Sequence, residues 1–376
     1  MKQKIKKQVK NLGKNKKVVV AMSGGVDSSV AALLMKKAGY NVIGVFMKNW
    51  SDKKNLAVCN WKEDRKVAMK ISAQLKIPLL SFDFEKEYRR IVVNEMFMLY
   101  KKGVTPNPDI TCNEKVKFPL LLKIAKKLRA DFIVTGHYAR IKKTKKGYKL
   151  LRAKDESKDQ SYFLYRLKRE WLPKILFPIG DLKKTEVREI AKKNGFENYN
   201  RKSTTGICFI GKVNLKQFLQ TRIKPKKGKI LDPEGKIIGF HDGVYYYTIG
   251  QRLGPRLGIL IEKGKEKKRW YVARKNVKKN LIIAAPEGHP LNLKKEFYLK
   301  KYYFINKSFF SELKKKKKAN VLCRIRQVGE LLDSKVLIER NKIKIVLKKP
   351  ITGISDGQAA VIYKGKEVLG GGVISF

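Results

Sequence analysis

The sequence predicts an α/β fold, with a doubly wound parallel sheet followed by a small β-rich central domain and a C-terminal β-barrel. Strands and helices alternate from about residue 17 to about residue 138, which is typical of a parallel sheet covered by helices. Short alternating strands separated by glycine turns fill the last quarter of the chain, as in a small barrel. We expect a basic N-terminal tail over residues 1–15, the α/β domain over 16–220, the central domain over 221–285 and the barrel over 286–376.

The hydrophobic pattern predicts the individual elements. The β-rich runs KVVVAM (17–22) and NVIGVFMK (41–48) flank a helical stretch that Gly39 closes. Further strands are expected at 78–84 and 131–138, helices through Met98 and at 120–128 and 185–195, and a hairpin around 146–147. Barrel strands are expected at 321–328, 335–340, 342–347 and 359–365, and the KKKKK run at 314–318 is expected to be a solvated loop.

Composition and charge indicate a globular protein with a polyanionic partner. Hydrophobic residues make up 43% of the chain. The sequence contains no stretch of eighteen apolar residues, which is the length needed to span a bilayer. The lysine-rich start is not followed by the hydrophobic segment typical of a secretory signal. We therefore expect a cytoplasmic protein without a membrane partner, acting as a monomer. The formal net charge of +56 favours nucleic acid as the partner, although lysines scattered over solvated faces would give the same number.

The four cysteines, Cys59, Cys112, Cys208 and Cys323, are widely spaced and form no C-x-x-C pair. This spacing predicts no metal site and no disulfide scaffold. Cys208 lies in the stretch STTGICFIG (203–211), directly after a glycine turn. Taken alone it is better explained as a buried thiol beside a glycine turn than as a reactive one.

A phosphate-binding turn is predicted where the first strand meets the first helix. In AMSGGVDSS (21–29), two glycines let the backbone N–H groups turn inward, and the helix N-terminus adds partial positive charge. The serines can donate hydrogen bonds, and Asp27 is placed to help hold Mg²⁺ on a nucleotide. The G-K-[ST] ending of a Walker A loop and the G-x-G-x-x-G pattern are both missing.

A second candidate segment is GVTPNPDITCNEKVKF (103–118). Its two prolines stiffen an extended stretch from which Asn107 and Asp109 project. Cys112 is expected at the start of the next helix, where the helix N-terminus and the nearby lysines favour the thiolate. A core thiol at this position is the alternative.

The motifs together resemble a known family. SGGVDSS is similar to the signature of the PP-loop ATP pyrophosphatases, which split ATP into AMP and pyrophosphate, so a PP-loop fold is expected. FMKNW, TPNPDITCN, TGHYAR, KDQSYFLY and STTGICFIG follow in the order found in one branch, the tRNA-specific 2-thiouridylases. The resemblance runs from about residue 16 to the C-terminal GGGVI.

The resemblance implies sulfur transfer to C2 of the wobble uridine of tRNA, with ATP and Mg²⁺ as cofactors. Cys208 would carry a persulfide delivered by a sulfur-relay protein or a cysteine desulfurase. Cys112 would assist its release, leaving a transient Cys112–Cys208 disulfide, and Asp109 would lie beside the reacting carbonyl. The implied ATP site is Ala21, Met22, Ser23, Gly24, Gly25, Val26, Asp27, Ser28, Met47 and Gly136. The implied tRNA contacts are Asn107, Pro108, Asp109, His137, Lys158, Asp159, Gln160, Arg324, Ile325 and Gln358.

Departures from the family pattern and two rival functions stay open at this point. Ser203 replaces the usual aspartate before Cys208, GQRLGPRLG (250–258) is longer than usual, and Ile325 stands where an aromatic residue is common. An amidating or ligating PP-loop synthetase acting on a small molecule would explain the phosphate loop. A non-catalytic RNA-binding relative would explain the charge. Neither rival explains both cysteine segments.

Overall fold

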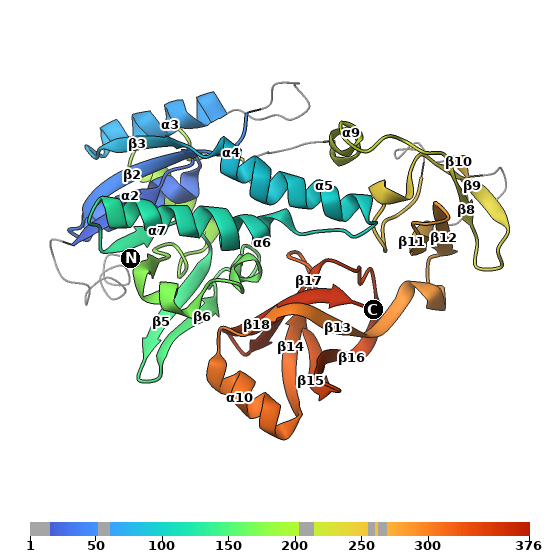
Figure 1. Cartoon of the computed structure of the whole chain (residues 1–376). Helices are drawn as coiled ribbons and strands as arrows, with labels where there is room; N and C mark the ends of the chain where they lie inside the picture. The colour runs from blue at the N-terminus through green and yellow to red at the C-terminus, as the bar shows by residue number, and fades with distance from the viewer. Residues whose placement is uncertain (1–15, 52–60, 203–213, 255–259, 262–268) are drawn as a thin grey trace. The chain divides into compact units, whose positions relative to one another are not determined.

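The computed structural model describes residues 16–51, 61–202, 214–254, 260–261 and 269–376. The chain divides into two compact units (Figure 1). The first draws on Met1–Val92, Asp109–Val213 and Gly365–Leu369. The second draws on Val93–Pro108, Asn214–Lys364 and Gly370–Phe376.

The first unit contains a parallel five-stranded sheet. Its strand order is β3-β2-β1-β4-β7, and every neighbouring pair is parallel. The strands are β1 (Lys17–Ala21), β2 (Asn41–Lys48), β3 (Leu79–Asp83), β4 (Phe132–Val134) and β7 (Ile175–Leu176). The predicted doubly wound sheet is therefore confirmed. Because the order reverses between β1 and β4, the crevice at the carboxyl end of β1 is where such sheets bind ligands.

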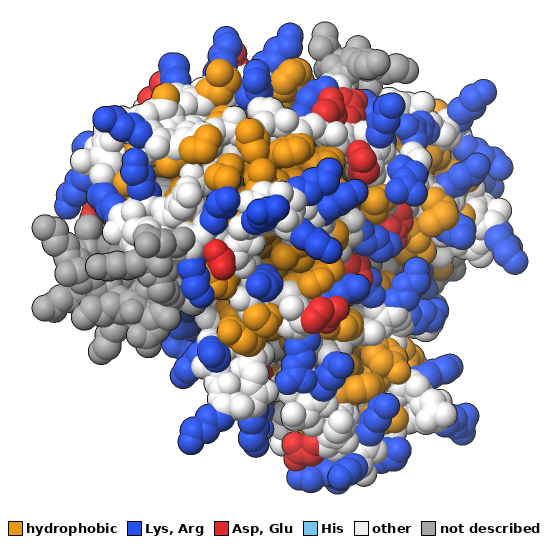
Figure 2. Space-filling view, turned by 60° about the vertical axis from the view of Figure 1, so that its left-hand side comes forward, with side chains coloured by type: hydrophobic (Ala, Val, Ile, Leu, Met, Phe, Trp, Pro, Cys, Tyr) orange, Lys and Arg blue, Asp and Glu red, His pale blue; other side chains and the backbone are white. Residues whose placement is uncertain are grey.

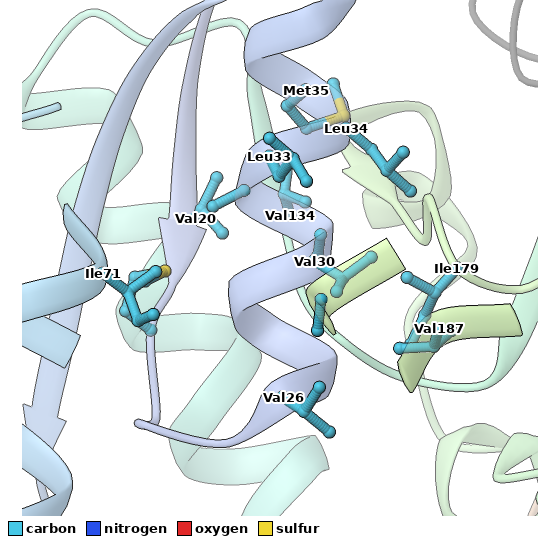
Figure 3. Packing of buried hydrophobic residues seen from close by; sticks show 14 of the residues in the cluster. Val20, Val26, Val30, Leu33, Leu34, Met35, Ile71, Val134, Ile179 and Val187 are labelled. Carbon is cyan, nitrogen blue, oxygen red and sulfur yellow. The ribbon is translucent and has the colours of Figure 1, made fainter. Parts of the chain in front are cut away.

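Helices cover this sheet and supply much of its core. They include α2 (Val26–Lys37), α3 (Trp61–Gln74), α4 (Glu85–Tyr88), α6 (Pro108–Cys112), α7 (Phe118–Lys127) and α8 (Lys184–Lys193), with π-helical turns at Arg89–Val93 and Asn113–Lys117. Figure 3 shows Val26 and Val30 of α2 near Ile179 and Val187, within one buried cluster that also contains Val20 and Val134. Helices α2 and α8 are thus fixed to each other by apolar packing. A hairpin of β5 (Ala139–Thr144) and β6 (Gly147–Arg152) confirms the turn expected at 146–147.

The second unit holds a smaller sheet and a barrel. The sheet order is β10-β9-β8-β12-β11, from β8 (Gly228–Leu231), β9 (Ile237–His241), β10 (Leu260–Ile261), β11 (Trp270–Asn276) and β12 (Leu281–Pro286). The barrel order is β13-β16-β15-β14-β17-β18, and β13 pairs with β18 to close it. Its strands are β13 (Leu293–Tyr303), β14 (Lys318–Arg324), β15 (Leu332–Glu339), β16 (Lys342–Thr352), β17 (Ala359–Lys364) and β18 (Glu367–Ser375). The unit also contains α5 (Asn94–Lys101) and α9 (Leu215–Gln220).

The lysine run at 314–318 corrects one expectation. Its first three residues end the helix α10 (Lys307–Lys316), Lys317 adopts a left-handed conformation with φ of 59°, and Lys318 begins β14. Asn306 caps this helix by accepting from the backbone N–H of Phe309. The side chains of the run are exposed, as expected, but its backbone forms a helix end and a sharp turn rather than a loop. Cations are favourable in the last turn of a helix.

Candidate active site

The phosphate loop lies at the carboxyl end of β1 and opens α2. Gly24 has a φ of +74°, and a Cβ atom there would lie 2.4 Å from the backbone oxygen of Asp64. Both the conformation and the space therefore require glycine. Gly25 is the N-cap residue of α2, and it has no side chain with which to bind the N–H groups of the first turn. These groups and the helix dipole are thus available to an anionic ligand.

Serine and asparagine side chains fix the shape of this loop. The Ser28 hydroxyl donates to the Gly25 carbonyl at 2.9 Å and lies 3.2 Å from the Ser23 hydroxyl. Asn198 Nδ2 donates to the Gly24 carbonyl at 2.9 Å and to the Ser29 hydroxyl at 3.0 Å. Asn198 was not found from the sequence, because it lies about 170 residues from the loop and no local motif points to it.

Asp27 is held by two residues that the sequence did not identify. Lys184 Nζ lies 2.6 and 2.8 Å from the two carboxylate oxygens, and the Tyr138 hydroxyl donates to Oδ1 at 2.9 Å. Burial and the neighbouring carboxylate raise the pKa of Tyr138 far above its usual value, so its hydroxyl keeps its proton. The carboxylate expected to help hold Mg²⁺ therefore faces an ammonium group in this structure.

Gly136 is needed for packing against the loop. A Cβ atom at this position would lie 2.7 Å from the backbone carbon of Asp27 and from the backbone nitrogen of Ser28. The absence of a side chain thus lets the end of β4 approach the first turn of α2. This close approach requires glycine at position 136 whether or not a nucleotide binds.

His137, the next residue, lies in the interior. Its Nδ1 is 2.6 Å from the Thr135 hydroxyl, and its ring stacks on Phe118 with a centroid separation of 5.7 Å. Burial, followed by the nearby Lys117 ammonium, lowers the pKa of His137 well below its usual value. The neutral, hydrogen-bonded ring fits a structural role.

The remaining nucleotide candidates are mostly apolar. Met22 at the end of the loop strand and Met47 in β2 are buried, with 1% and 6% of their surfaces exposed. Val26 is also buried, whereas Ser23 is exposed and Ala21 is partly exposed. Buried methionines beside a phosphate loop shape an apolar wall rather than donate hydrogen bonds.

Cys112 lies deeper in a helix than the sequence indicated. Helix α6 begins at Pro108, so Asp109 is in its first turn and Cys112 is its last residue, leading into the π-helical turn Asn113–Lys117. Its side chain is completely buried. The thiol therefore lies one turn away from the helix N-terminus, and the carboxylate of Asp109 takes the position that the helix dipole favours.

Asn107 and Pro108 belong to the second unit, where polar side chains hold the loop that precedes them. Gln358 Nε2 donates to the backbone carbonyls of Thr105 and Pro106, both at 3.1 Å. The Gln358 amide expected to contact RNA is thus bound to the backbone of the TPNP loop (residues 105–108).

The KDQ segment is largely internal. Asp159 is 1% exposed and accepts from the backbone N–H groups of Ala153 and Ser161 at 3.0 and 3.2 Å. Gln160 accepts from the backbone N–H of Tyr138 at 2.9 Å, and Lys158 is exposed. Of the three, Lys158 is exposed, Gln160 is half-buried and Asp159 is buried.

The other two barrel candidates, Arg324 and Ile325, are buried. Arg324, 4% exposed, lies over the ring of Tyr363 at 5.6 Å, and Ile325 is 3% exposed. Cys208, its expected disulfide with Cys112, and Cys59 lie outside the described residues. Within the described part of the chain, no helix is both long and apolar enough to cross a membrane.

Comparisons with known proteins agree with the phosphate loop and the parallel sheet. Residues 16–212 match a family profile described as a tRNA methyl transferase HUP domain. Residues 216–286 match its PRC-barrel domain, and residues 299–374 match an aminomethyltransferase β-barrel domain. A curated tRNA-specific 2-thiouridylase MnmA of Bacillus licheniformis is 43% identical over 95% of this chain and 94% of its own length. The chain belongs to the tRNA-specific 2-thiouridylase family.

Other members of the family align equally well. The relative from Buchnera aphidicola is 44% identical over 96% of this chain and 97% of its own, and one from Listeria monocytogenes is 42% identical over 95% and 94%. The profile descriptions mention methyl transfer, but the whole-length likeness is to sulfurtransferases. A solved 4-thiouridine synthetase–RNA complex with bound ATP shares 19% identity and a TM-score of 0.36, over 55% of this chain and 50% of that one. This structural similarity covers only about half of each chain.

Proposed function

We propose that the protein uses ATP to thiolate C2 of the wobble uridine of tRNA, releasing AMP and pyrophosphate. The observation that carries this proposal is the phosphate loop, in which a left-handed Gly24 and the side-chain-free cap Gly25 leave the first turn of α2 open to an anion. Whole-length similarity to curated 2-thiouridylases supplies the reaction class.

The residues at the loop fit ATP better than they fit a bare metal ion. The inward-turned backbone and the exposed Ser23 suit phosphate oxygens, and the buried Met22 and Met47 suit an apolar base. Asp27, in contrast, is already bound to Lys184 and Tyr138. We propose that Mg²⁺ enters with the phosphates of ATP rather than binding to the protein beforehand.

The proposed sulfur chemistry needs two thiols. ATP supplies the adenylyl group that makes the C2 oxygen of uridine a leaving group. Cys208 carries the persulfide, its outer sulfur forms the bond to C2, and the Cys112 thiolate attacks the inner sulfur. The S–S bond of the persulfide breaks as the Cys112–Cys208 disulfide forms. External thiols then reduce this disulfide, and a sulfur-relay protein or a cysteine desulfurase reloads Cys208.

The proposed tRNA contacts divide according to exposure. Lys158 can bind phosphate directly, and Asn107 and Asp109 would meet the target base. The buried His137, Asp159, Arg324 and Ile325 act by supporting the backbone around them, as Gln160 and Gln358 do through their hydrogen bonds. We place the enzyme in the cytoplasm as a monomer.

The test is mass spectrometry of nucleosides from tRNA incubated with the protein, Mg-ATP and a limiting persulfide donor. Wild type is expected to form 2-thiouridine at the wobble position with one AMP per thiolation, and Cys208→Ser and Cys112→Ser are expected to form none. AMP release without thiouridine would favour the small-molecule synthetase. Binding of tRNA without ATP consumption would favour the non-catalytic relative.

A further inference from the structure

Helix α5 has an exposed side that the chemistry described above does not use. Asn94, Met98, Lys101 and Lys102 follow one another at intervals of three and four residues, so they lie on one side of the helix. All four residues are exposed. Met98 is 50% exposed, although methionine is among the residue types that are most often buried. Exposed methionines are typical of surfaces that bind other proteins.

Helix α9 packs beside α5 and extends this exposed side (Figure 1). The ring centroids of Phe97 and Phe218 are 5.4 Å apart, and the Arg222 guanidinium lies over the Phe97 ring at 4.8 Å. Arg222 Nη1 also donates to Asn94 Oδ1 at 2.8 Å. The side chains along α5 are therefore joined to those that follow α9 in one continuous surface.

We propose that this surface, formed by Asn94, Met98, Lys101, Lys102 and Arg222, is the docking site of the protein that delivers sulfur to Cys208. The partner is a protein that carries a cysteine persulfide beside an acidic face with an apolar centre. The inference rests on the proposed function and names the partner of its loading step. In that step the Cys208 thiolate attacks the outer sulfur of the partner's persulfide, the partner's S–S bond breaks, and the partner keeps a thiolate.

The charge of the surface indicates an acidic partner. Lys101, Lys102 and Arg222 are exposed, and the contact between Arg222 and Asn94 is with a neutral amide, so it leaves the positive charge of the guanidinium uncompensated. Glu95 is the one acidic residue within residues 94–102 and 214–227 of the sequence. A surface with this charge attracts and orients an acidic protein face.

The place of α9 in the chain connects the surface to the thiol that has to be loaded. Asn214 caps α9, and its side chain accepts from the backbone N–H of Gln217 at 3.2 Å. Cys208 precedes this cap by six residues, and a chain of six residues spans at most about 22 Å. A partner bound beside α9 is therefore within reach of the segment that it has to load.

The exposed thioether favours a protein over RNA as the occupant. RNA backbone contacts are made by cations and hydrogen-bond donors, and Met98 provides neither. Protein interfaces instead bury an apolar centre inside a polar rim. Along α5, Met98 lies between Asn94, which binds Arg222, and the two lysines at 101 and 102. This arrangement matches a small protein interface.

The experiment measures 2-thiouridine in a tRNA transcript supplied with Mg-ATP and one of two sulfur sources. The first source is isotopically labelled cysteine with an extract of the cells that make this protein, immunodepleted of the protein itself. Sulfur from cysteine then has to pass through a persulfide-carrying protein. The second source is excess sodium sulfide with the purified protein. Sulfide can displace AMP from the adenylated uridine without a protein donor.

The test variants are Met98→Glu and Arg222→Glu, which place a carboxylate opposite the acidic partner. Met69→Glu is the matched control, because Met69 is 47% exposed and belongs to α3. At limiting extract, we expect each test variant to lower cysteine-dependent thiolation about 10-fold or more. Sulfide-dependent thiolation should change less than about 2-fold, which also shows that the variants fold. The control should match wild type with both sources.

The outcomes separate this inference from its rivals. Equal losses with both sulfur sources, or weaker tRNA binding by the test variants in fluorescence anisotropy, would assign the surface to folding or to RNA and overturn the docking role. If the test variants match wild type with both sources, or if wild type uses sulfide but no sulfur from cysteine, the inference alone is refuted. If wild type forms no 2-thiouridine from either source, the proposed function itself fails.

Discussion

At the scale of single residues, the first unit uses buried polar groups to shape its loops. Asp159 binds two backbone N–H groups and the Ser161 hydroxyl, and His137 pairs with the Thr135 hydroxyl between Phe118 and Phe177. A buried group without such partners would cost about 1–3 kcal/mol. These buried residues therefore fix the backbone conformation of the residues next to them in the chain.

His137 makes the stability of the protein depend on pH. Burial lowers its pKa below 6.5, so below that pH the unfolded chain binds a proton that the folded protein does not. The free energy of unfolding therefore falls as the pH drops through this window. His137→Gln should be less stable than wild type at pH about 7.5, because a buried ring and its hydrogen bond are lost at a cost of roughly 1–3 kcal/mol.

The difference in the free energy of unfolding between wild type and His137→Gln should narrow towards pH about 5.5. The reason is that only in wild type does the unfolded chain gain a proton that the folded protein does not bind. Thermal unfolding midpoints measured across this pH range test the prediction. A constant difference over this range would contradict the buried neutral ring. The affinity of His137→Gln for tRNA should stay close to that of wild type if the ring does not touch RNA.

Residue roles were predictable where a motif was local and not where partners were distant. The glycines and serines of the loop could be identified from SGGVDSS because strand, turn and helix follow directly in sequence. Lys184, Tyr138 and Asn198 could not, since they reach the loop only after the sheet and α8 have packed. Burial of Asp159 was likewise invisible, because KDQ has the composition of a solvated turn.

At the scale of elements, the segment before Asn107 is held by side chains of the second unit. Lys275 Nζ donates to the Gly103 carbonyl at 2.6 Å, the Thr105 and Thr248 hydroxyls are 3.0 Å apart, and Gln358 binds the Thr105 and Pro106 carbonyls. Burial lowers the pKa of Lys275 to about 8. These side chains, with the stiffness of the prolines, hold the loop in one conformation.

Removal of the Gln358 amide should loosen this loop without unfolding the barrel. In Gln358→Ala, two carbonyl hydrogen bonds are lost at about 1 kcal/mol each, so the backbone N–H groups within residues 103–107, which Pro106 lacks, should exchange with deuterium about 10-fold faster. The kcat of thiolation should fall more than the KM for tRNA rises if, as proposed, the loop positions the base rather than capturing RNA. Gln217→Ala, at an exposed position of α9, is the control and should match wild type in exchange and kinetics. Unchanged exchange at 103–107 would refute the positioning role.

The elements themselves were predicted unevenly. Strands β1, β2, β3 and β4 of the parallel sheet were predicted from hydrophobic runs, because a run of buried residues can be recognised from the local sequence. The two-residue strand β7 was not predicted. The start of α6 at Pro108 was missed by one turn because Pro-Asn-Pro favours extended structure, although proline is well suited to the first turn of a helix. Helix α10 was missed because its lysines resemble a solvated run, and the pairing of β13 with β18 joins strands about 75 residues apart.

At the scale of the whole molecule, charge is the dominant feature. The chain carries 88 lysines and arginines against 32 aspartates and glutamates, and Figure 2 shows the basic side chains spread widely over the visible face. Dispersed charge attracts a polyanion from many directions but gives little sequence information, because phosphate contacts are the same for every tRNA. Selection of the correct uridine therefore has to come from contacts other than those with phosphate, and the proposed source is the loop around Asn107 and Asp109.

If phosphate contacts supply the affinity and other contacts select the uridine, the response of tRNA binding and thiolation to salt can be predicted. The logarithm of the association constant for tRNA should fall linearly with the logarithm of salt concentration, with a slope set by the number of neutralised phosphates. A tRNA in which cytidine replaces the wobble uridine should give the same slope and nearly the same Kd, yet accept no sulfur. Fluorescence anisotropy between about 50 and 200 mM salt measures the slope, over which six to ten phosphate contacts reduce affinity about 10³- to 10⁵-fold. A markedly weaker, salt-insensitive complex with the cytidine tRNA would instead place the specificity in binding, and the loop would then act as the reader of the base before any chemistry begins.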